Sequence, residues 1–315
     1  TYGSFEEGTA RRAVFPAAVE HIGVLFSPTS LDESVRWFDA AFGRETAANP
    51  YLDQRVIWIA VLFLGAVGLF WAGARIATGR STSAGSLDQS AISNLQSPIS
   101  WWLIALGPAV LAPLLLRVLP VQDVLPILVG GPLALLFLIY GLLTAVGLWL
   151  AHKWHPALLP DPALQRRAIG LPLFRYVAVA LLTFGYVLLT FGLPAQQFLL
   201  NYFPPAPRWW VFVAVLVAML PYFLADEWLT RRAAGPRWAY PITKVLFVVA
   251  MALAITLDTR LFFLVLVAPV FVLYFVLYGL FSRWLFRATG STLPGALANA
   301  AIFAWFVAAV FPLVA

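Results

Sequence analysis

Long apolar runs separated by short polar stretches make up the sequence from residue 56 onward. A helix needs roughly 20 mostly apolar residues to cross a bilayer core of about 30 Å. Eight segments approach this length, at residues 56–74, 101–116, 124–150, 174–193, 209–224, 244–257, 261–281 and 296–314. The pattern therefore predicts a mainly α fold over residues 56–315, a polytopic helical membrane bundle with about eight transmembrane helices.

The sixth and seventh segments are separated only by the four residues LDTR, 257–260. A single span of their combined length would exceed the bilayer thickness, so the sequence predicts a tight helical hairpin here. Prolines inside the segments predict bends, because proline cannot donate the backbone hydrogen bond of a regular helix; they are Pro108, Pro113, Pro126, Pro132, Pro221 and Pro269. Such bends either shape a lipid-facing groove or belong to an inert bundle.

The composition agrees with a membrane protein and divides the chain by charge. Of the 315 residues, 62% are hydrophobic and 11% are charged, against about 25% charged in soluble proteins. Cysteine is absent, which excludes disulfides and thiolate metal sites. The net charge of +6 combines −4 over residues 1–54 (four Arg, eight Asp or Glu) with +10 over the remainder. The acidic head and the basic body are therefore different kinds of structure.

The distribution of Lys and Arg between the loops predicts the orientation in the membrane, because cytoplasmic loops are enriched in both. The loops after the first, third, fifth and seventh spans, which we call the odd-numbered loops, carry twelve Lys or Arg residues: Arg75, Arg80, Lys153, Arg166, Arg167, Arg175, Arg231, Arg232, Arg237, Lys244, Arg283 and Arg287. The loops on the other side of the membrane carry three. This places the odd-numbered loops in the cytoplasm, with the N-terminal segment and Ala315 outside. Topology thus accounts for the basic charge, and nucleic acid is not an expected partner.

The predicted spans contain no ionisable residue near their centres. Asp123, Asp226, Glu227, Lys244 and Asp258 all fall at predicted ends. Pumps and ion-coupled transporters normally need ionisable groups inside the membrane. A transporter is therefore the least favoured class of function.

Two polar motifs lie at the ends of predicted spans. His152 and His155, three residues apart, have a spacing that can hold a metal, heme or pigment, but no carboxylate is nearby and an interfacial anchor is favoured. We therefore predict no cofactor and no metal. Glu227 and Arg231, four residues apart in ADEWLTRR, indicate an ion-pair cluster; a phospholipid headgroup site is the alternative.

The first 45 residues carry a different pattern. Residues 12–15 are predicted to form a short strand, followed by a turn and by His21 in a loop. Ser30, with Glu33 three residues later, forms a predicted capping box, and Gly43 is expected to end the helix. The apolar residues of this helix recur at helical intervals, at Leu31, Val35, Phe38 and Phe42.

The stretch AAVEHIGVLFSPTSLDESVRWFDAAFG resembles the end of the α/β-hydrolase fold, where the catalytic histidine follows the last strand and precedes a final helix. The resemblance covers about the first 45 residues and implies that His21 is the general base for a serine nucleophile. The family's G-x-S-x-G motif is absent, since GRSTS (residues 79–83) lacks the second glycine. The triad acid precedes the histidine in this family, so it would lie upstream of Thr1, and we interpret the chain as the C-terminal part of a longer protein. The given sequence alone therefore lacks a nucleophile and an acid.

The whole arrangement is similar to bacterial membrane proteins that carry an extracytoplasmic hydrolase-like domain and a long C-terminal membrane region. PYFLADEWLTRR and FAWFVAAVFP carry this second resemblance. It implies a multi-pass protein of the bacterial cytoplasmic (inner) membrane, with residues 1–45 as the end of the hydrolase-like domain, 46–55 as a linker and 56–315 as the membrane domain.

Two functional hypotheses follow. The first is serine-type hydrolysis of an ester or amide at the extracytoplasmic face, with the helices as an anchor in contact with membrane lipids. The alternative is a non-catalytic structural or assembly subunit of a larger membrane complex, in contact with other membrane subunits, lipids or a pigment.

Overall fold

The computed structural model describes residues 2–19, 23–45, 54–79, 99–119, 124–154, 172–233 and 235–313. The chain divides into two compact units, residues 1–65 and residues 66–315, and we call the second the helical block. The boundary falls inside α2 (Arg55–Gly79), and most of the predicted linker (residues 46–53) lies outside the described residues.

Apart from helix α1 (Pro28–Ala41) and the beginning of α2, the described part of the first unit contains little regular structure. A single antiparallel bridge joins Tyr2 to Arg11, and a short 3₁₀ helix, η1 (Gly23–Phe26), precedes α1. The predicted strand at residues 12–15 is wrong for this structure, because these residues have no ladder partner in the described part of the chain. A strand is stable only when a neighbouring strand satisfies its backbone groups.

Helix α1 has well-defined ends, one of which differs from the prediction. Its N-cap is Ser27, whose side chain accepts from the Ser30 amide, and Pro28 occupies the first turn. The predicted cap at Ser30 is therefore wrong by one turn; proline after serine is the stronger start signal. The C-terminus agrees with the prediction, since Gly43 takes a φ of +63° and Arg44 donates to the Asp39 carbonyl at 2.8 Å.

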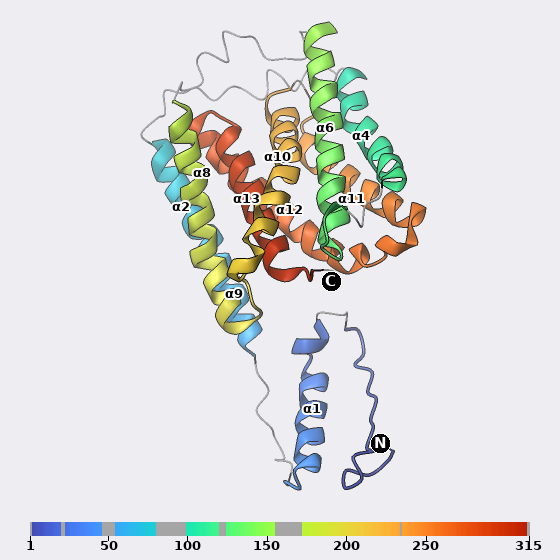
Figure 1. Ribbon diagram of the computed structural model, residues 1–315. Coiled ribbons are helices and arrows are strands. Elements are labelled where there is room, and N and C mark those ends of the chain that lie inside the picture. The colour runs from blue at the N-terminus through green and yellow to red at the C-terminus, as the bar shows by residue number, and fades with distance from the viewer. Residues whose placement is uncertain are drawn as a thin grey trace. The chain divides into compact units, whose positions relative to one another are not determined.

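In the described residues, eight helices are long and apolar enough to cross a membrane, which confirms the sequence prediction. They alternate in direction along the chain (Figure 1). The remaining elements are α4 (Ile99–Val118), α6 (Gly130–Trp154), α8 (Leu173–Val187), α9 (Leu193–Phe198), α10 (Trp209–Arg231), α11 (Ala239–Leu257), α12 (Leu264–Thr289) and α13 (Leu293–Val310).

Several helix ends differ from the predicted spans. α6 begins at Gly130 rather than near residue 124, because Pro126 lies in a turn and Ile127 forms a bridge to Leu313. Of the six prolines expected to bend spans, Pro108, Pro113, Pro221 and Pro269 lie in helix interiors, and Pro132 lies in the first turn of α6. α10 extends to Arg231 and α11 begins at Ala239, so both helices continue through the charged residues that were expected to end them.

The fourth span is interrupted by a wider turn. Between α8 and α9 the chain forms a π-helical turn, η3 (Leu188–Gly192), and the three elements together cover Leu173–Phe198. Pro194, which has no amide proton to donate, follows within the first turn of α9. The extra residue of a π turn absorbs such an interruption without ending the helix.

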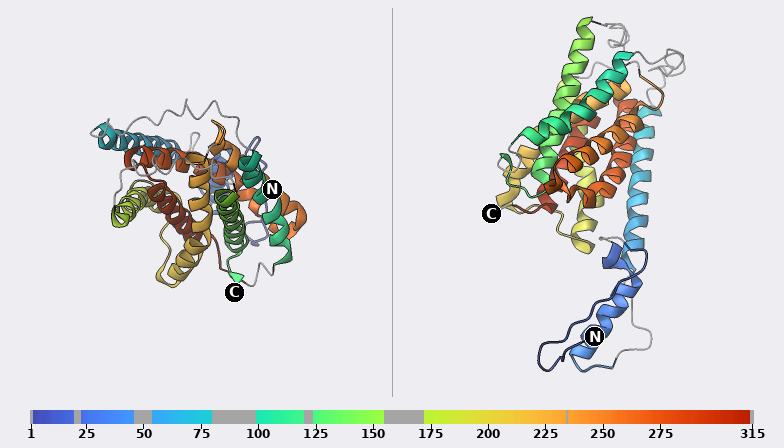
Figure 2. Two further views of the ribbon diagram at one scale, coloured as in Figure 1. Left: turned by 90° about the horizontal axis from the view of Figure 1, so that it is seen from above. Right: turned by 90° about the vertical axis from the view of Figure 1, so that its right-hand side faces the viewer.

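The core of the helical block is built around α13, which packs against α8, α10 and α12 (Figure 1, Figure 2). α13 is the most buried of the eight spans and is rich in Ala, a small residue that allows close approach of neighbouring helices. α6 and α10 also approach closely: a Cβ on Gly141 would lie 2.2 Å from the Tyr222 amide nitrogen. Only glycine fits at that position.

The predicted hairpin between the sixth and seventh spans is present. Asp258 caps the 3₁₀ turn η5 (Thr259–Leu261) by accepting from the Arg260 amide at 3.0 Å. α12 then begins at Leu264, three residues after η5 ends.

Candidate functional site

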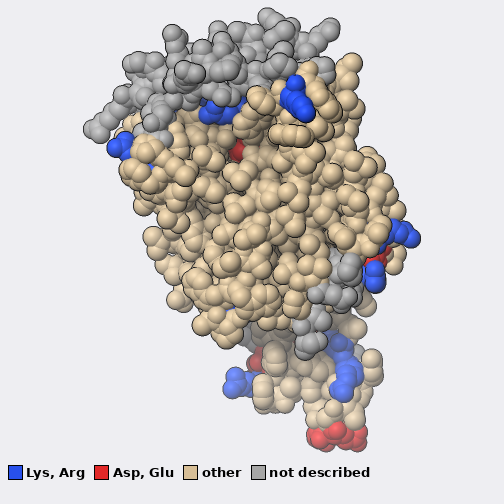
Figure 3. Space-filling model, turned by 45° about the horizontal axis from the view of Figure 1, so that its top comes forward, with Lys and Arg blue, Asp and Glu red and all other residues tan. Residues whose placement is uncertain are grey.

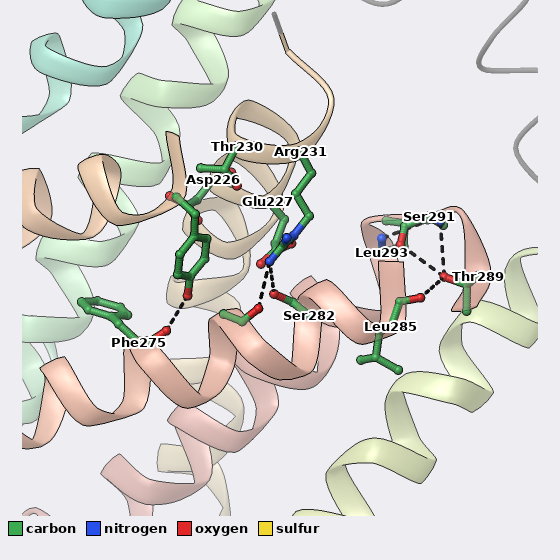
Figure 4. A network of polar contacts seen from close by, with 12 residues as sticks. Asp226, Glu227, Thr230, Arg231, Phe275, Ser282, Leu285, Thr289, Ser291 and Leu293 are labelled. Carbon is green, nitrogen blue, oxygen red and sulfur yellow. Dashed lines mark hydrogen bonds and ion pairs between the residues drawn. The ribbon is translucent and has the colours of Figure 1, made fainter. Parts of the chain in front are cut away.

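Four ionisable side chains gather inside the helical block where α10 ends and α11 begins, which we call the α10–α11 end. Figure 4 shows three of them, Asp226, Glu227 and Arg231. Asp226, Glu227 and Lys244 are buried, and Arg231 is mostly buried. The sequence placed Asp226, Glu227 and Lys244 at the ends of predicted spans, and in the structure they lie inside longer helices, one to two turns from the end of α10 or the start of α11, with Arg231 as the last residue of α10. Ionisable residues inside a membrane helix usually have a structural partner or a function.

Asp226 on α10 and Lys244 on α11 form a direct ion pair between the two helices. The Lys244 Nζ also donates to the Tyr222 hydroxyl at 3.3 Å. It lies 4.5 Å from the ring centre of Tyr240 and 5.4 Å from that of Phe275. The ammonium group is thus surrounded by one carboxylate, one hydroxyl and the faces of aromatic rings, which stabilise a cation.

Glu227 and Arg231 form the ion pair that their spacing predicts, and this part of the prediction is confirmed. The Arg231 Nη2 reaches α12, where it donates to the Ser282 hydroxyl at 2.6 Å and to the Gly279 carbonyl at 3.2 Å. Tyr240 completes the connection by donating to the Phe275 carbonyl at 2.7 Å. We call the six residues Tyr222, Asp226, Glu227, Arg231, Tyr240 and Lys244 the charge cluster; it joins α10, α11 and α12.

The charge cluster repeats a simple sequence pattern on two helices. Tyr222 precedes Asp226 by four residues on α10, and Tyr240 precedes Lys244 by four on α11. Residues four apart lie on one face of a helix, so each tyrosine accompanies the charged residue one turn away. This signal was present in the sequence but becomes meaningful only once both helices are known to extend past their charged residues.

The chemistry of the charge cluster is that of a closed, neutral network. Its two carboxylates are each matched by a cation. In the described part of the chain, no three His, Cys, Asp or Glu side chains lie close enough together to hold a metal ion. The pairs are buried, so removing one partner leaves an isolated charge in an apolar environment, which is far costlier than removing both.

The proposed headgroup site at Arg231 and Arg232 is not supported by their side-chain contacts. Arg231 is occupied by Glu227 and Ser282. Arg232 donates to the Gly290 carbonyl at 2.6 Å, with its guanidinium 5.9 Å from the Phe286 ring centre. Both arginines connect α10 to α12 or to the turn that follows it.

The opposite end of the helical block, where α11 ends and α12 begins, uses arginine differently. We call it the α11–α12 end. Arg208 donates to the carbonyls of Ala309 and Phe311, which follow or end α13. Arg117 donates to the Leu257 carbonyl at 2.8 Å, and Arg260 pairs with Asp258 at 2.7 Å. Two of these three arginines therefore satisfy carbonyl groups at helix ends.

The surface between the two ends carries almost no charge in the view of Figure 3. Lys and Arg side chains gather toward the ends, as expected for a block that faces lipid along its length.

Of the three histidines that the sequence singled out, the structure describes only His152. His21 and His155 lie outside the described residues. His152 is exposed near the end of α6, beside Lys153, whose Nζ is 5.8 Å from the Trp149 ring centre. Gly79 ends α2, and residues 80–83 of the GRSTS stretch also lie outside the described residues.

Comparison with protein-family models, with curated proteins and with solved structures found no match for the chain. The resemblance to the α/β-hydrolase family consequently stays a prediction, and so does the role of His21.

Proposed function

We propose that the chain belongs to a membrane-anchored hydrolase of the serine type. Residues 1–45 are the end of an α/β-hydrolase-like domain at the extracytoplasmic face of a bacterial inner membrane, and the eight spans are its anchor. The substrate is an ester or amide presented at that membrane surface. His21 is the general base, with its serine and acid partners in a part of the protein that precedes Thr1.

The observation that carries this proposal is the exposed apolar face of the first unit. Phe15 is 91% exposed, and on α1 Phe38 and Phe42 are 58% and 70% exposed. Among the described residues from 2 to 45, only Ala10 and Ser27 are buried. A segment that buries no large apolar side chain has no core of its own. Its amphipathic helix is typical of one layer of a larger α/β domain.

The chemistry assigned to His21 is a proton transfer. The imidazole accepts the proton of the serine hydroxyl as the serine oxygen attacks the substrate carbonyl, and it returns the proton to the leaving group. His21 precedes α1 by seven residues in the sequence, and catalytic side chains are commonly held on loops by a rigid scaffold.

The test is covalent labelling of the full-length protein in its membrane with a fluorophosphonate, followed by intact-mass analysis. One labelled serine is expected in the wild type and none in His21→Ala. The matched control is His152→Ala, which should label like the wild type because His152 is an exposed residue of α6. A wild type without label, or equal labelling of His21→Ala, would contradict the proposal.

A second candidate is a structural subunit of a larger membrane complex, and the exposure of α2 favours it. Only 11% of the most apolar window of α2 is buried, the smallest share among the eight spans. Its exposed side chains include Leu64, Leu69, Trp71 and Ile76. Such a helix has most of its surface available for a partner helix as well as for lipid.

Photo-cross-linking in the native membrane separates the two candidates. A photoreactive residue at Leu69 should form a defined protein adduct if α2 contacts a partner subunit. The control position is Leu182 on α8, which is 73% exposed and should give lipid adducts. Lipid adducts alone at both positions would remove the support for the assembly role.

A further inference from the structure

Two arginines differ from every other cation in the described part of the helical block. Each other Lys or Arg there contacts a carbonyl, a carboxylate or an aromatic ring: Arg75, Arg117, Lys153, Arg175, Arg208, Arg231, Arg232, Arg237, Lys244 and Arg260. Arg283 and Arg287 on α12 are exposed and have no such contact among the described residues.

The two guanidinium groups lie one helical turn apart on the same face of α12. The charges that act on Arg283 in the structure are those of Arg287 and Arg231, both positive. Two like charges four residues apart on a helix destabilise it slightly unless an anion lies between them. The described side chains supply no such anion, because the carboxylates of the charge cluster are matched by Lys244 and Arg231.

Below the two arginines, the same face of α12 is apolar and exposed. Val272 and Val276 are 51% and 55% exposed, and Leu280 is half-buried. Positions 272, 276, 280, 283 and 287 follow one another at intervals of three or four residues, so they form one stripe along the helix. The stripe therefore places two cations at the end of the span and an apolar track toward its middle.

We propose that this stripe binds an anionic phospholipid. The phosphate of the headgroup lies between the Arg283 and Arg287 guanidinium groups, which match phosphate oxygens in shape and charge. One acyl chain lies along Leu280, Val276 and Val272. This site goes beyond a general excess of positive charge, because the other described cations at the α10–α11 end already have contacts within the protein.

Native mass spectrometry of the protein from mixed micelles tests the assignment. The protein is equilibrated with equal amounts of phosphatidylglycerol and phosphatidylcholine that carry the same acyl chains, and the retained lipids are counted. The variant is Arg283→Gln with Arg287→Gln. The matched control, Lys153→Gln with Arg175→Gln, removes two exposed charges from the same end of the block.

The wild type and the control should retain one phosphatidylglycerol in preference to phosphatidylcholine. The Arg283/Arg287 variant should lose this preference by roughly 25-fold, from about fivefold for each arginine near an anionic headgroup. An equal loss in both double variants would mean a diffuse positive surface and would overturn the site. No loss in either would overturn it as well. Thermal unfolding of each variant verifies that the block is folded, and only a small change is expected because all four side chains are exposed.

Discussion

The two ends of the helical block use positive charge in opposite ways. At the α10–α11 end, Lys244 and Arg231 are drawn into the interior and neutralised by Asp226 and Glu227. At the α11–α12 end, the half-buried Arg208 and the exposed Arg117 donate to backbone carbonyls. A charge inside the block demands a carboxylate, whereas a charge at its edge is satisfied by a helix end.

The difference has an energetic consequence. Buried ion pairs repay the cost of removing both charges from water only while both partners are present. When an arginine that caps a carbonyl group is removed, the protein loses only the hydrogen bond between them. Substitutions in the charge cluster should therefore be severe singly and mild in matched pairs, and those of the carbonyl-capping arginines at the other end should be moderate and additive.

The largest expected effect is that of Asp226→Ala, which leaves the Lys244 ammonium buried without its carboxylate. We expect a loss of about 3–5 kcal/mol in the free energy of unfolding. The combined variant Asp226→Leu with Lys244→Met removes both charges and should recover most of this loss. Unfolding in mixed micelles, followed by circular dichroism, gives the double-mutant cycle. If the loss in the combined variant equalled the sum of the losses in the two single variants, Asp226 and Lys244 would not be a coupled pair.

An intermediate effect is expected for Arg208→Ala at the opposite end. The substitution removes donors to the Ala309 and Phe311 carbonyls, and hydrogen bonds to charged groups contribute about 1.5–3 kcal/mol. We expect a loss of about 2 kcal/mol in the same unfolding measurement. Arg208→Lys keeps the charge but only one donor group, so the stability of this variant should lie between that of the wild type and that of Arg208→Ala. A loss as large as that of Asp226→Ala would remove the distinction between the ends.

The smallest effect concerns pH. The hydrogen bond from Arg260 lowers the pKa of Asp258 below its usual value of 3.8. The folded state therefore binds this proton less readily than the unfolded state. The resulting stability is present above the unfolded pKa and is lost as the pH falls through the folded pKa. Because the Arg260 side chain is exposed, the contribution should be below about 1 kcal/mol.

Comparison of the wild type with Asp258→Asn measures this contribution. The wild type should be the more stable at about pH 5, and the difference should shrink as the pH falls toward about 2. A difference that does not change with pH would show that the Asp258 carboxylate acts only as the cap of η5.

The eight spans were predictable because a membrane helix needs a long apolar run, and the hairpin at Asp258 followed from the length limit. The ends of α10 and α11 were not. Hydropathy ends a span at its first charged residue, whereas the helix continues when that charge finds a partner on a neighbouring helix. Asp226 and Lys244 are 18 residues apart, and nothing local to either indicates the other.

In the first unit, local features could be predicted from the sequence, whereas features that depend on distant partners could not. Gly43 was correctly expected to end α1, since its left-handed conformation is a local requirement that glycine meets at no cost. The strand at residues 12–15 was not found, because a strand depends on partners that the local sequence does not contain. His21 lies outside the described residues, so its assignment rests on the sequence alone.

The π turn between α8 and α9 also sets the rotation of everything that follows it. Each residue of a helix turns the chain by about 100°, so one residue fewer in Leu188–Gly192 would rotate α9 by that angle. Gln196 would then point away from the Tyr202 and Phe203 amides, to which its Oε1 is now bonded at 2.6 and 3.0 Å. The extra residue thus rotates the end of the span so that the face carrying Gln196 points toward the loop that leads to α10.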